Sequence, residues 1–167
     1  MKFLIVVDMQ NDFIEGTLGS SHAEAIVPAV VQRVRSFDGS IIFTRDTHNE
    51  NYLNTQEGKK LPVEHCIKGT PGWEICDALK EYAHTVIDKP TFGCAELPAL
   101  LSALGSVDEV TLVGLCTDIC VISNAMLIKA AFPEAKVIID SSCCAGVTPE
   151  SHNNALAAMA AVQIEII

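Results

Sequence analysis

The stretch EVTLVGLCTDICV, residues 109–121, joins an apolar run to a segment of helical character. Its first half, 109–114, is typical of a parallel strand buried on both faces, and Thr117 is a natural N-cap for a following helix. Cys116 and Cys120 lie where the two halves meet. A strand that leads directly into a helix is the repeating unit of α/β proteins, so this stretch predicts that fold class.

The same alternation extends along the whole chain. Residues 2–8, KFLIVVD, are a near-continuous apolar run typical of a buried strand. Further strands are expected at 40–45, 85–89, 136–140 and 163–167, and helices at 22–35, 73–81, 96–104, 117–131 and 149–161. Alternating strands and helices imply right-handed crossovers. We therefore predict a three-layer α/β sandwich that forms one domain over residues 1–167.

Composition limits the classes of partner. The net charge of −10 argues against nucleic acid, because binding to a phosphate backbone needs clustered Lys and Arg. No apolar run reaches the roughly 20 residues that span a bilayer, so no membrane partner is expected. Seven cysteines without a secretion signal indicate reduced thiols and a cytoplasmic location.

Chemically capable side chains follow several of the predicted strands. Asp8, Asp46, Lys89, Cys116 and Cys120 all lie at or just beyond a carboxyl end. Because ligands of open parallel sheets bind outside the carboxyl ends of the strands, these residues predict one site at that edge.

Three of these residues have both a chemical and an ordinary explanation. Cys120 lies near the third position of its helix, where the helix dipole stabilises a thiolate, but cysteine is also a common core residue. Asp8 is a candidate general base whose pKa apolar surroundings would raise, or a turn residue. Lys89 is a partner for a carboxylate and a thiol, or a side chain that extends to solvent.

The long segment 46–72 lacks clear periodicity, and a loop of this length in a compact domain is usually functional or disordered. Asp46 and His48 in RDTH are spaced to bind one ion, His65 lies at the far end of the loop, and Glu57 lies between them. Mixed His and carboxylate ligands suit Zn²⁺, Fe²⁺ or Mn²⁺. Asp-x-His in a loop is also a common turn, so both interpretations stay open.

Five motifs occur in a fixed order: VDMQNDF (7–13), RDTH (45–48), EHCIKGTPGWE (64–74), DKPTFGCAEL (88–97) and GLCTDICV (114–121). Together they resemble the isochorismatase-like cysteine hydrolases, particularly their nicotinamidase branch. The resemblance covers nearly the whole chain, from residue 3 to about residue 150.

The resemblance implies a six-stranded parallel sheet and a catalytic triad. In that triad Asp8 is the base, Lys89 supports it, and Cys120 attacks the substrate carbonyl to form a thioester that water then hydrolyses. It further implies a cis peptide between Leu115 and Cys116, with the backbone N–H groups of Cys116 and Cys120 as an oxyanion hole.

The resemblance also implies one divalent metal ion, with Zn²⁺ expected first and Fe²⁺ or Mn²⁺ as alternatives. The matching ligands are Asp46, His48 and His65, and Glu57 matches a fourth acidic ligand found in part of the branch. Relatives are often homodimers or homotetramers, so a homo-oligomer is expected here.

The substrate implied is a small amide, with nicotinamide first. Phe13 and Phe92 match aromatic residues of the substrate pocket, but Pro62 stands where a second stacking aromatic is normally found. The alternatives are another small amide, such as an N-carbamoyl compound or a ureide, and a non-catalytic small-molecule binder that retains the fold.

Overall fold

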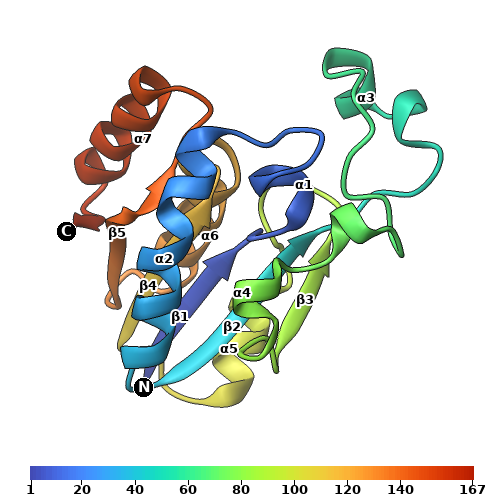
Figure 1. The fold of residues 1–167 in the computed structure, drawn as a ribbon. Coiled ribbons are helices and arrows are strands. Elements are labelled where there is room, and N and C mark those ends of the chain that lie inside the picture. Colours follow the sequence, from blue (N-terminus) through green and yellow to red (C-terminus); the bar gives the residue numbers. More distant parts are fainter.

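Six parallel strands form the centre of the molecule in the computed structural model, which describes residues 1–167 (Figure 1). Their order across the sheet is β3-β2-β1-β4-β5-β6, and each neighbouring pair is parallel. The strands are β1 (Lys2–Val7), β2 (Ser40–Asp46), β3 (Val86–Lys89), β4 (Glu109–Leu115), β5 (Lys136–Ala145) and β6 (Glu165–Ile166). The predicted six-stranded parallel sheet is therefore confirmed.

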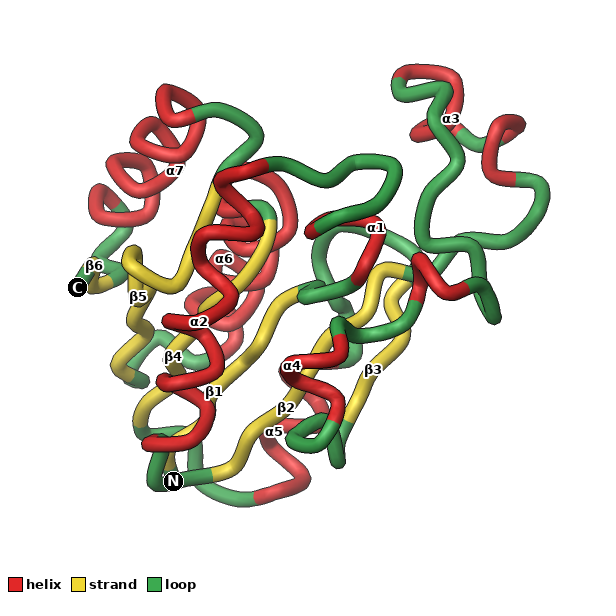
Figure 2. Tube along the Cα trace, viewed as in Figure 1, coloured by secondary structure: helices red, strands yellow, loops and turns green.

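Helices cover both faces of this sheet (Figure 2). They are α1 (Asn11–Ile14), α2 (Ser21–Ser36), α3 (Gln56–Lys60), α4 (Asp77–Lys80), α5 (Leu97–Leu104), α6 (Ile122–Ala131) and α7 (Pro149–Ala161). Two 3₁₀ turns, Tyr52–Asn54 and Pro71–Trp73, and one π-helical turn, Thr117–Val121, complete the set. The side chains of Ser20 and Thr148 cap the first turns of α2 and α7, as polar N-caps do.

The alternation of side chains along β1 separates two hydrophobic cores. Leu4 and Val6 pack with α1, α2 and α4 on one face, whereas Phe3, Ile5 and Val7 pack with α5, α6 and α7 on the other. All five side chains are fully buried. Each such residue contributes about 1.5–3 kcal/mol by burial, and together they produce the three layers.

The sheet has its switch point between β1 and β4. The chain builds outward from β1 to β3 and then crosses to β4 on the other side of β1. Gly114, with φ of +114°, lies so close to β1 that a Cβ there would overlap the carbonyl oxygen of Val7. This glycine therefore lets the ends of β1 and β4 meet where a ligand site is expected.

Several predicted elements differ in extent, and the edge strand expected at 163–167 is limited to Glu165–Ile166. The helix expected at 73–81 is reduced to α4, because Ile75 pairs with Gln10 and the backbone N–H of Cys76 donates to the carbonyl of Met9 at 2.9 Å. β5 runs five residues beyond the expected end at 140. The register between β4 and β5 shifts, so that β5 continues through its polar residues after 140 and Cys144 pairs with Gly114.

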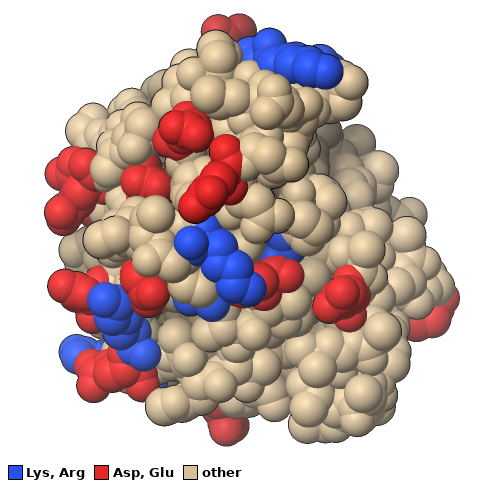
Figure 3. Space-filling model, turned by 90° about the vertical axis from the view of Figure 1, so that its right-hand side faces the viewer, with Lys and Arg blue, Asp and Glu red and all other residues tan.

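Charged side chains are interspersed on the face that carries the loop between β2 and β3. Figure 3 shows basic side chains in separate small groups, with acidic side chains around them. None of the helices has the length and apolar character needed to cross a membrane.

Candidate active site

A buried aspartate, lysine and cysteine meet at the switch point of the sheet. Lys89 is the last residue of β3, Asp8 directly follows β1, and Cys120 lies in the π-helical turn after β4. The Lys89 Nζ lies 2.6 Å from Asp8 Oδ2 and 3.5 Å from Cys120 Sγ. None of the three residues is more than 5% exposed, so they interact in a dry environment.

The backbone of Asp8 directs its side chain into this group. Asp8 has φ of +48°, a left-handed conformation that is uncommon for a residue with a Cβ. The Oγ1 of Thr44 donates to Asp8 Oδ1 at 2.7 Å, which leaves Oδ2 for Lys89. Strained backbone of this kind is found mainly where surrounding contacts enforce it at functional positions.

The turn that carries Cys120 is π-helical instead of the expected α-helical start. The carbonyl of Cys116 accepts hydrogen bonds from the backbone N–H groups of Ile119 and Val121, and not from Cys120 between them. The peptide bond between Leu115 and Cys116 is cis, as the resemblance implied. Because the Cys116 carbonyl accepts from Ile119 and Val121, the Cys120 N–H lacks the i−4 bond that an α-helix would impose.

The predicted N-cap role of Thr117 is wrong. Cys116 occupies the N-cap position, and the Oγ1 of Thr117 instead lies 2.8 Å from the Nδ1 of His152 on α7. His152 itself is only partly exposed. The turn after β4 is therefore held by a tertiary contact and not by a cap of its own.

Burial dominates the ionisation of the triad. It raises the pKa of Asp8, against the opposing effect of Lys89. Burial and the Asp8 carboxylate raise the pKa of Cys120 well above its ordinary value. Lys89 stays charged, because Asp8, Cys120 and Asp46 outweigh burial and raise its pKa. The position of Cys120 near a helix start therefore does not outweigh its burial, and its proton needs a nearby acceptor.

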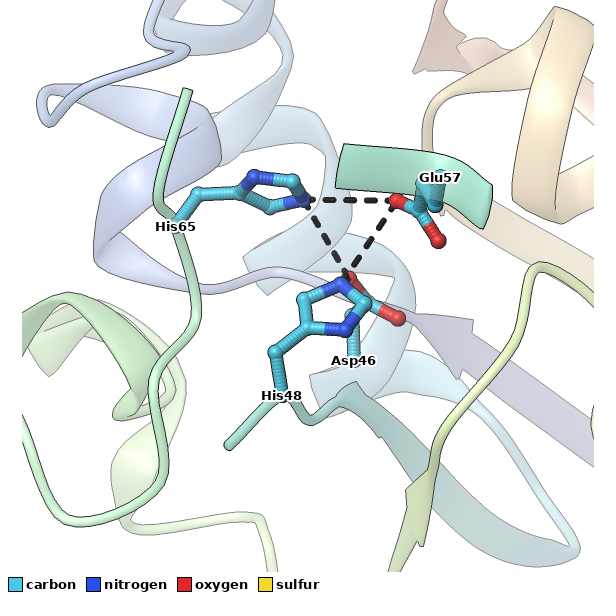
Figure 4. Close-up of side chains that lie close together, drawn as sticks. All are labelled: Asp46, His48, Glu57 and His65. Atoms are coloured by element: carbon cyan, nitrogen blue, oxygen red, sulfur yellow. Dashed lines mark ion pairs between the residues drawn. The ribbon is translucent and has the colours of Figure 1, made fainter. Parts of the chain in front are cut away.

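A second group of side chains converges beside the triad. Asp46, His48, Glu57 and His65 each present one ligand-type atom, and these atoms all lie within 4.8 Å of one another. Figure 4 shows the four side chains pointing toward a common centre, from β2, the following loop, α3 and the segment before Cys66. The structure thus brings together all four residues expected to bind a metal.

The hydrogen bonding of the histidines fits a metal site. The Nε2 of His48 is buried and makes no hydrogen bond, although it lies 2.9 Å from Asp46 Oδ2 and 3.6 Å from Glu57 Oε1. The Nδ1 of His65 lies 2.8 Å from the carbonyl of Val63, so its Nε2 faces the same centre. Two imidazole nitrogens and two carboxylates in this arrangement suit a divalent ion.

The pKa values of the two carboxylates in this group are shifted in opposite directions. Burial opposes the charge of Asp46, but His48 and Lys89 outweigh it and hold the pKa of Asp46 below its usual value. Burial raises the pKa of Glu57. Lys89 Nζ also donates to Asp46 Oδ1 at 3.2 Å, so one ammonium contacts both the triad and the ligand group.

The expected aromatic residues come from different elements of the fold. The ring of Phe13, on α1, is 5.6 Å from the ring of His65, centroid to centroid. Phe92 follows β3 and is 44% exposed. Pro62 is exposed in the segment that leads to His65.

Two supporting residues were missed in the sequence. The buried side chain of Gln10 accepts from the N–H of Asp46 at 2.7 Å and donates to the carbonyl of Asp46 at 2.8 Å. The fully buried ring of Tyr52 lies 4.6 Å from that of His48 and 5.0 Å from that of His65. Gln10 lies within VDMQNDF, which was a signal, whereas nothing near Tyr52 distinguished it from a loop residue.

An open parallel sheet with a ligand site at its switch point defines the general class of three-layer α/β proteins. The profile described as "Isochorismatase domain" matches residues 2–167, and the chain belongs to this family. It is 28% identical to the nicotinamidase of Schizosaccharomyces pombe over 98% of this chain and 91% of that protein. It is 29% identical to the nicotinamidase/pyrazinamidase of Mycobacterium tuberculosis over 100% and 98%, respectively.

Solved structures agree with this assignment. A pyrazinamidase of Pyrococcus horikoshii in complex with zinc superposes with a TM-score of 0.87 and 30% identity, over 99% of this chain and 98% of that one. The pyrazinamidase/nicotinamidase of Streptococcus mutans gives a TM-score of 0.83 and 30% identity over the full length of both chains. The zinc complex and the ligand group seen here together support a divalent metal in this protein.

Proposed function

We propose that this protein is a metal-dependent nicotinamidase, which converts nicotinamide and water to nicotinate and ammonia. The observation that carries the proposal is the contact of Lys89 with Asp8, Cys120 and Asp46, which joins a nucleophile group to a metal-ligand group in one buried site. The family and its nicotinamidase relatives indicate an amidohydrolase that acts on carbon–nitrogen bonds.

In the first half-reaction Cys120 Sγ attacks the amide carbonyl carbon. Its proton passes to Asp8 and then to the leaving nitrogen, so the carbon–nitrogen bond breaks and ammonia leaves behind a Cys120 thioester. The raised pKa of Asp8 suits this role, because a stronger base accepts the thiol proton more readily near neutral pH. Lys89 remains charged and balances the carboxylate and the developing thiolate.

In the second half-reaction water attacks the thioester. Asp8 takes a proton from the water, the carbon–sulfur bond breaks, and the proton returns to the Cys120 sulfur as the acid leaves. In both halves the carbonyl oxygen develops negative charge. The backbone N–H groups of Cys116 and Cys120 are the proposed donors to that oxygen, and the π-helical hydrogen bonding around Cys120 supports this role.

Asp46, His48 and His65, with Glu57 as the fourth ligand, would hold the metal ion, and Zn²⁺ is our first choice. A divalent ion bound there supplies a Lewis acid for the ring nitrogen of the substrate. Phe13 and Phe92 are the proposed contacts for the substrate ring, since aromatic rings stack on one another with about 0.5–1.5 kcal/mol beyond burial.

Pro62 favours a second candidate substrate class. With proline where a second stacking aromatic is expected, the pocket is less specific for a flat pyridine ring, and another small amide, an N-carbamoyl compound or a ureide fits the same chemistry. The triad serves equally for these substrates.

We also propose that the protein is a cytoplasmic homodimer or homotetramer. All seven cysteines are unpaired, which suits a reducing compartment. Leu127 on α6 is 38% exposed and offers apolar surface for an interface. Molar mass from light scattering tests the assembly, and a monomer at micromolar concentration would refute it.

The test of the activity is ammonia release by the zinc-loaded protein from nicotinamide and, in parallel, from an N-carbamoyl amino acid, with Cys120→Ala as the control. Cysteine-dependent release from nicotinamide alone supports the first proposal. Release from the carbamoyl compound alone supports the second. Release that persists in Cys120→Ala would refute the mechanism for both.

A further inference from the structure

Asn124, on the first turns of α6, is fully buried and bonds to two separate segments of the active site. Its Nδ2 donates to the carbonyl of Cys120 at 2.8 Å and to the carbonyl of Phe92 at 3.3 Å. Its Oδ1 accepts from the N–H of Cys94 at 2.8 Å. All three partners are main-chain groups, so Asn124 bridges the nucleophile turn and the segment 92–94 whatever side chains those segments carry.

The segment 92–94 follows Lys89 after two residues, Pro90 and Thr91, and Thr91 links it to the Lys89 side chain. Lys89 Nζ donates to the carbonyl of Thr91 at 3.0 Å, as well as contacting Cys120 Sγ at 3.5 Å. Gly93 approaches α6 so closely that a Cβ there would lie 2.8 Å from Cδ1 of Leu127. The position of this segment against α6 therefore helps to determine where the Lys89 ammonium lies relative to the sulfur.

We propose that Asn124 is a positioning residue that sets the separation between Lys89 and Cys120. Its side chain joins the Cys120 carbonyl by hydrogen bonds to the segment 92–94, which orients the Lys89 ammonium. Cys120 and Lys89 therefore move together. A carboxamide is suited to the task, because one planar group offers two donors and an acceptor. The inference rests on the proposed role of Cys120 as the nucleophile.

The neighbouring Ser123 provides a matched control. Its Oγ donates to the carbonyl of Ile119 at 2.6 Å, a bond from α6 to the same π-helical turn, and it makes no hydrogen bond to the segment 92–94. Ser123→Ala thus removes a local bond of the turn and leaves the bridge. Asn124→Ser keeps the bond to the turn and loses the bridge. A serine hydroxyl can reach the Cys120 carbonyl four residues earlier, as that of Ser123 reaches Ile119, but it is too short for Phe92 and Cys94.

The experiment measures the rate at which iodoacetamide alkylates Cys120 in the zinc-loaded full-length protein, with labelled peptides quantified by mass spectrometry. No substrate is needed, and zinc content and melting temperature are recorded for each variant. Loss of a buried bridge displaces Lys89 from the sulfur and disfavours the thiolate, so Asn124→Ala and Asn124→Ser should both slow alkylation by about tenfold. Ser123→Ala should stay within about twofold of the parent protein, because no bridging bond is lost.

A second readout separates positioning from general loosening of the fold. For hydrolysis of nicotinamide, kcat should fall with the alkylation rate. KM should rise by no more than about threefold, because Asn124 touches no metal ligand and bonds only the main-chain carbonyl of Phe92, a proposed contact of the substrate ring. Parent-like alkylation in Asn124→Ser, or an equal loss in Ser123→Ala, would overturn the proposal. If nicotinamide is not hydrolysed but the alkylation pattern is as expected, the substrate assignment fails and the role of Asn124 stands.

Discussion

The triad and the metal-ligand group lie side by side but are supported in different ways. Asp8 and Lys89 are fixed by strand ends of the sheet, and Cys120 by the turn that follows a strand. Of the metal ligands only Asp46 belongs to a strand, whereas Glu57 is on α3, which stands away from the sheet in Figure 1. The positions of the triad side chains are therefore fixed by the sheet. The positions of the metal-ligand side chains depend on local contacts within a long loop.

Those local contacts centre on Tyr52. Its ring packs against both ligand histidines, and its Oη donates to the carbonyl of Leu61 at 2.9 Å, near the far end of the loop. We therefore expect the triad and the metal-ligand group to lose their functions independently of each other. Loss of the metal should leave the nucleophile reactive, and loss of the nucleophile should leave the metal bound.

The largest effect is expected for Cys120→Ala. Turnover should fall by about 10⁴-fold or more, because the thioester cannot form, while one zinc ion per chain remains bound. The measurement is ammonia release together with zinc content. Cys116→Ala is the matched control and should retain most of its activity, since the proposed oxyanion hole uses only the backbone N–H of Cys116. Zinc loss in Cys120→Ala would contradict the independence of the two groups.

His48→Ala should weaken zinc binding by about 10³-fold, because it removes one ligand of a four-residue site. Competition with a chromophoric chelator measures the affinity. Alkylation of Cys120 by iodoacetamide should change little, since His48 does not contact the sulfur. The exposed His84 supplies the control variant His84→Ala, and an equal loss of zinc there would show that the ligands are assigned wrongly.

A smaller effect is expected at Tyr52, which supports the ligands without binding the ion. Tyr52→Leu removes the ring from His48 and His65 and should weaken zinc binding by about 10–100-fold, the usual cost of losing such support. Tyr52→Phe keeps the ring and loses only the bond to Leu61, so its affinity should fall by less. If both variants weaken zinc equally, the hydrogen bond and not the ring supports the site.

The smallest effect concerns His152, which supports the nucleophile turn through Thr117. Burial lowers the pKa of His152 below its ordinary value of 6.5. The unfolded chain therefore takes up the proton first as the pH falls, and the stability that His152 contributes above pH 6.5 is lost as the pH falls from there toward its lowered pKa.

Urea denaturation of the parent protein and of His152→Gln at pH 7.5 and pH 5 measures this contribution. The parent should lose more free energy of unfolding than the variant, by less than about 1 kcal/mol because His152 is partly exposed to solvent. A pH dependence identical in both proteins would show that burial does not perturb the pKa of His152.

The strand pattern predicted much of this site. Apolar runs located β1, β2, β3 and β4, and the rule that ligands bind at carboxyl ends brought Asp8, Asp46, Lys89 and Cys120 to one edge. Glu57 and His65 were candidates because they lie with His48 in the long loop 46–72, and the resemblance implied their role as metal ligands. Local periodicity could not show the π-helical turn, because the same residues fit an α-helix, and its different hydrogen bonding depends on the chain around it.

The buried amides and the loop residues were not predicted from the sequence, for another reason. Gln10 and Asn124 belong to a polar type that is usually exposed, and only the fold brings main-chain partners to their side chains. The end of β5 was misplaced at 140 because the serines after Asp140 suggest a turn, whereas in the sheet Asp140 lies beside Arg33 of α2 at 3.5 Å.

The central place of β1 also bears on how the chain acquires its site during synthesis. β1 is synthesised before β4, yet the register that buries its second edge pairs Lys2 with Glu109 of β4. Until β4 has left the ribosome, one edge of β1 has no partner strand. Cys120, which follows β4, is then also absent from the site beside Asp8. Such distant pairings fold slowly. The nascent chain is therefore exposed to aggregation for most of its synthesis and gains its active site as a late event.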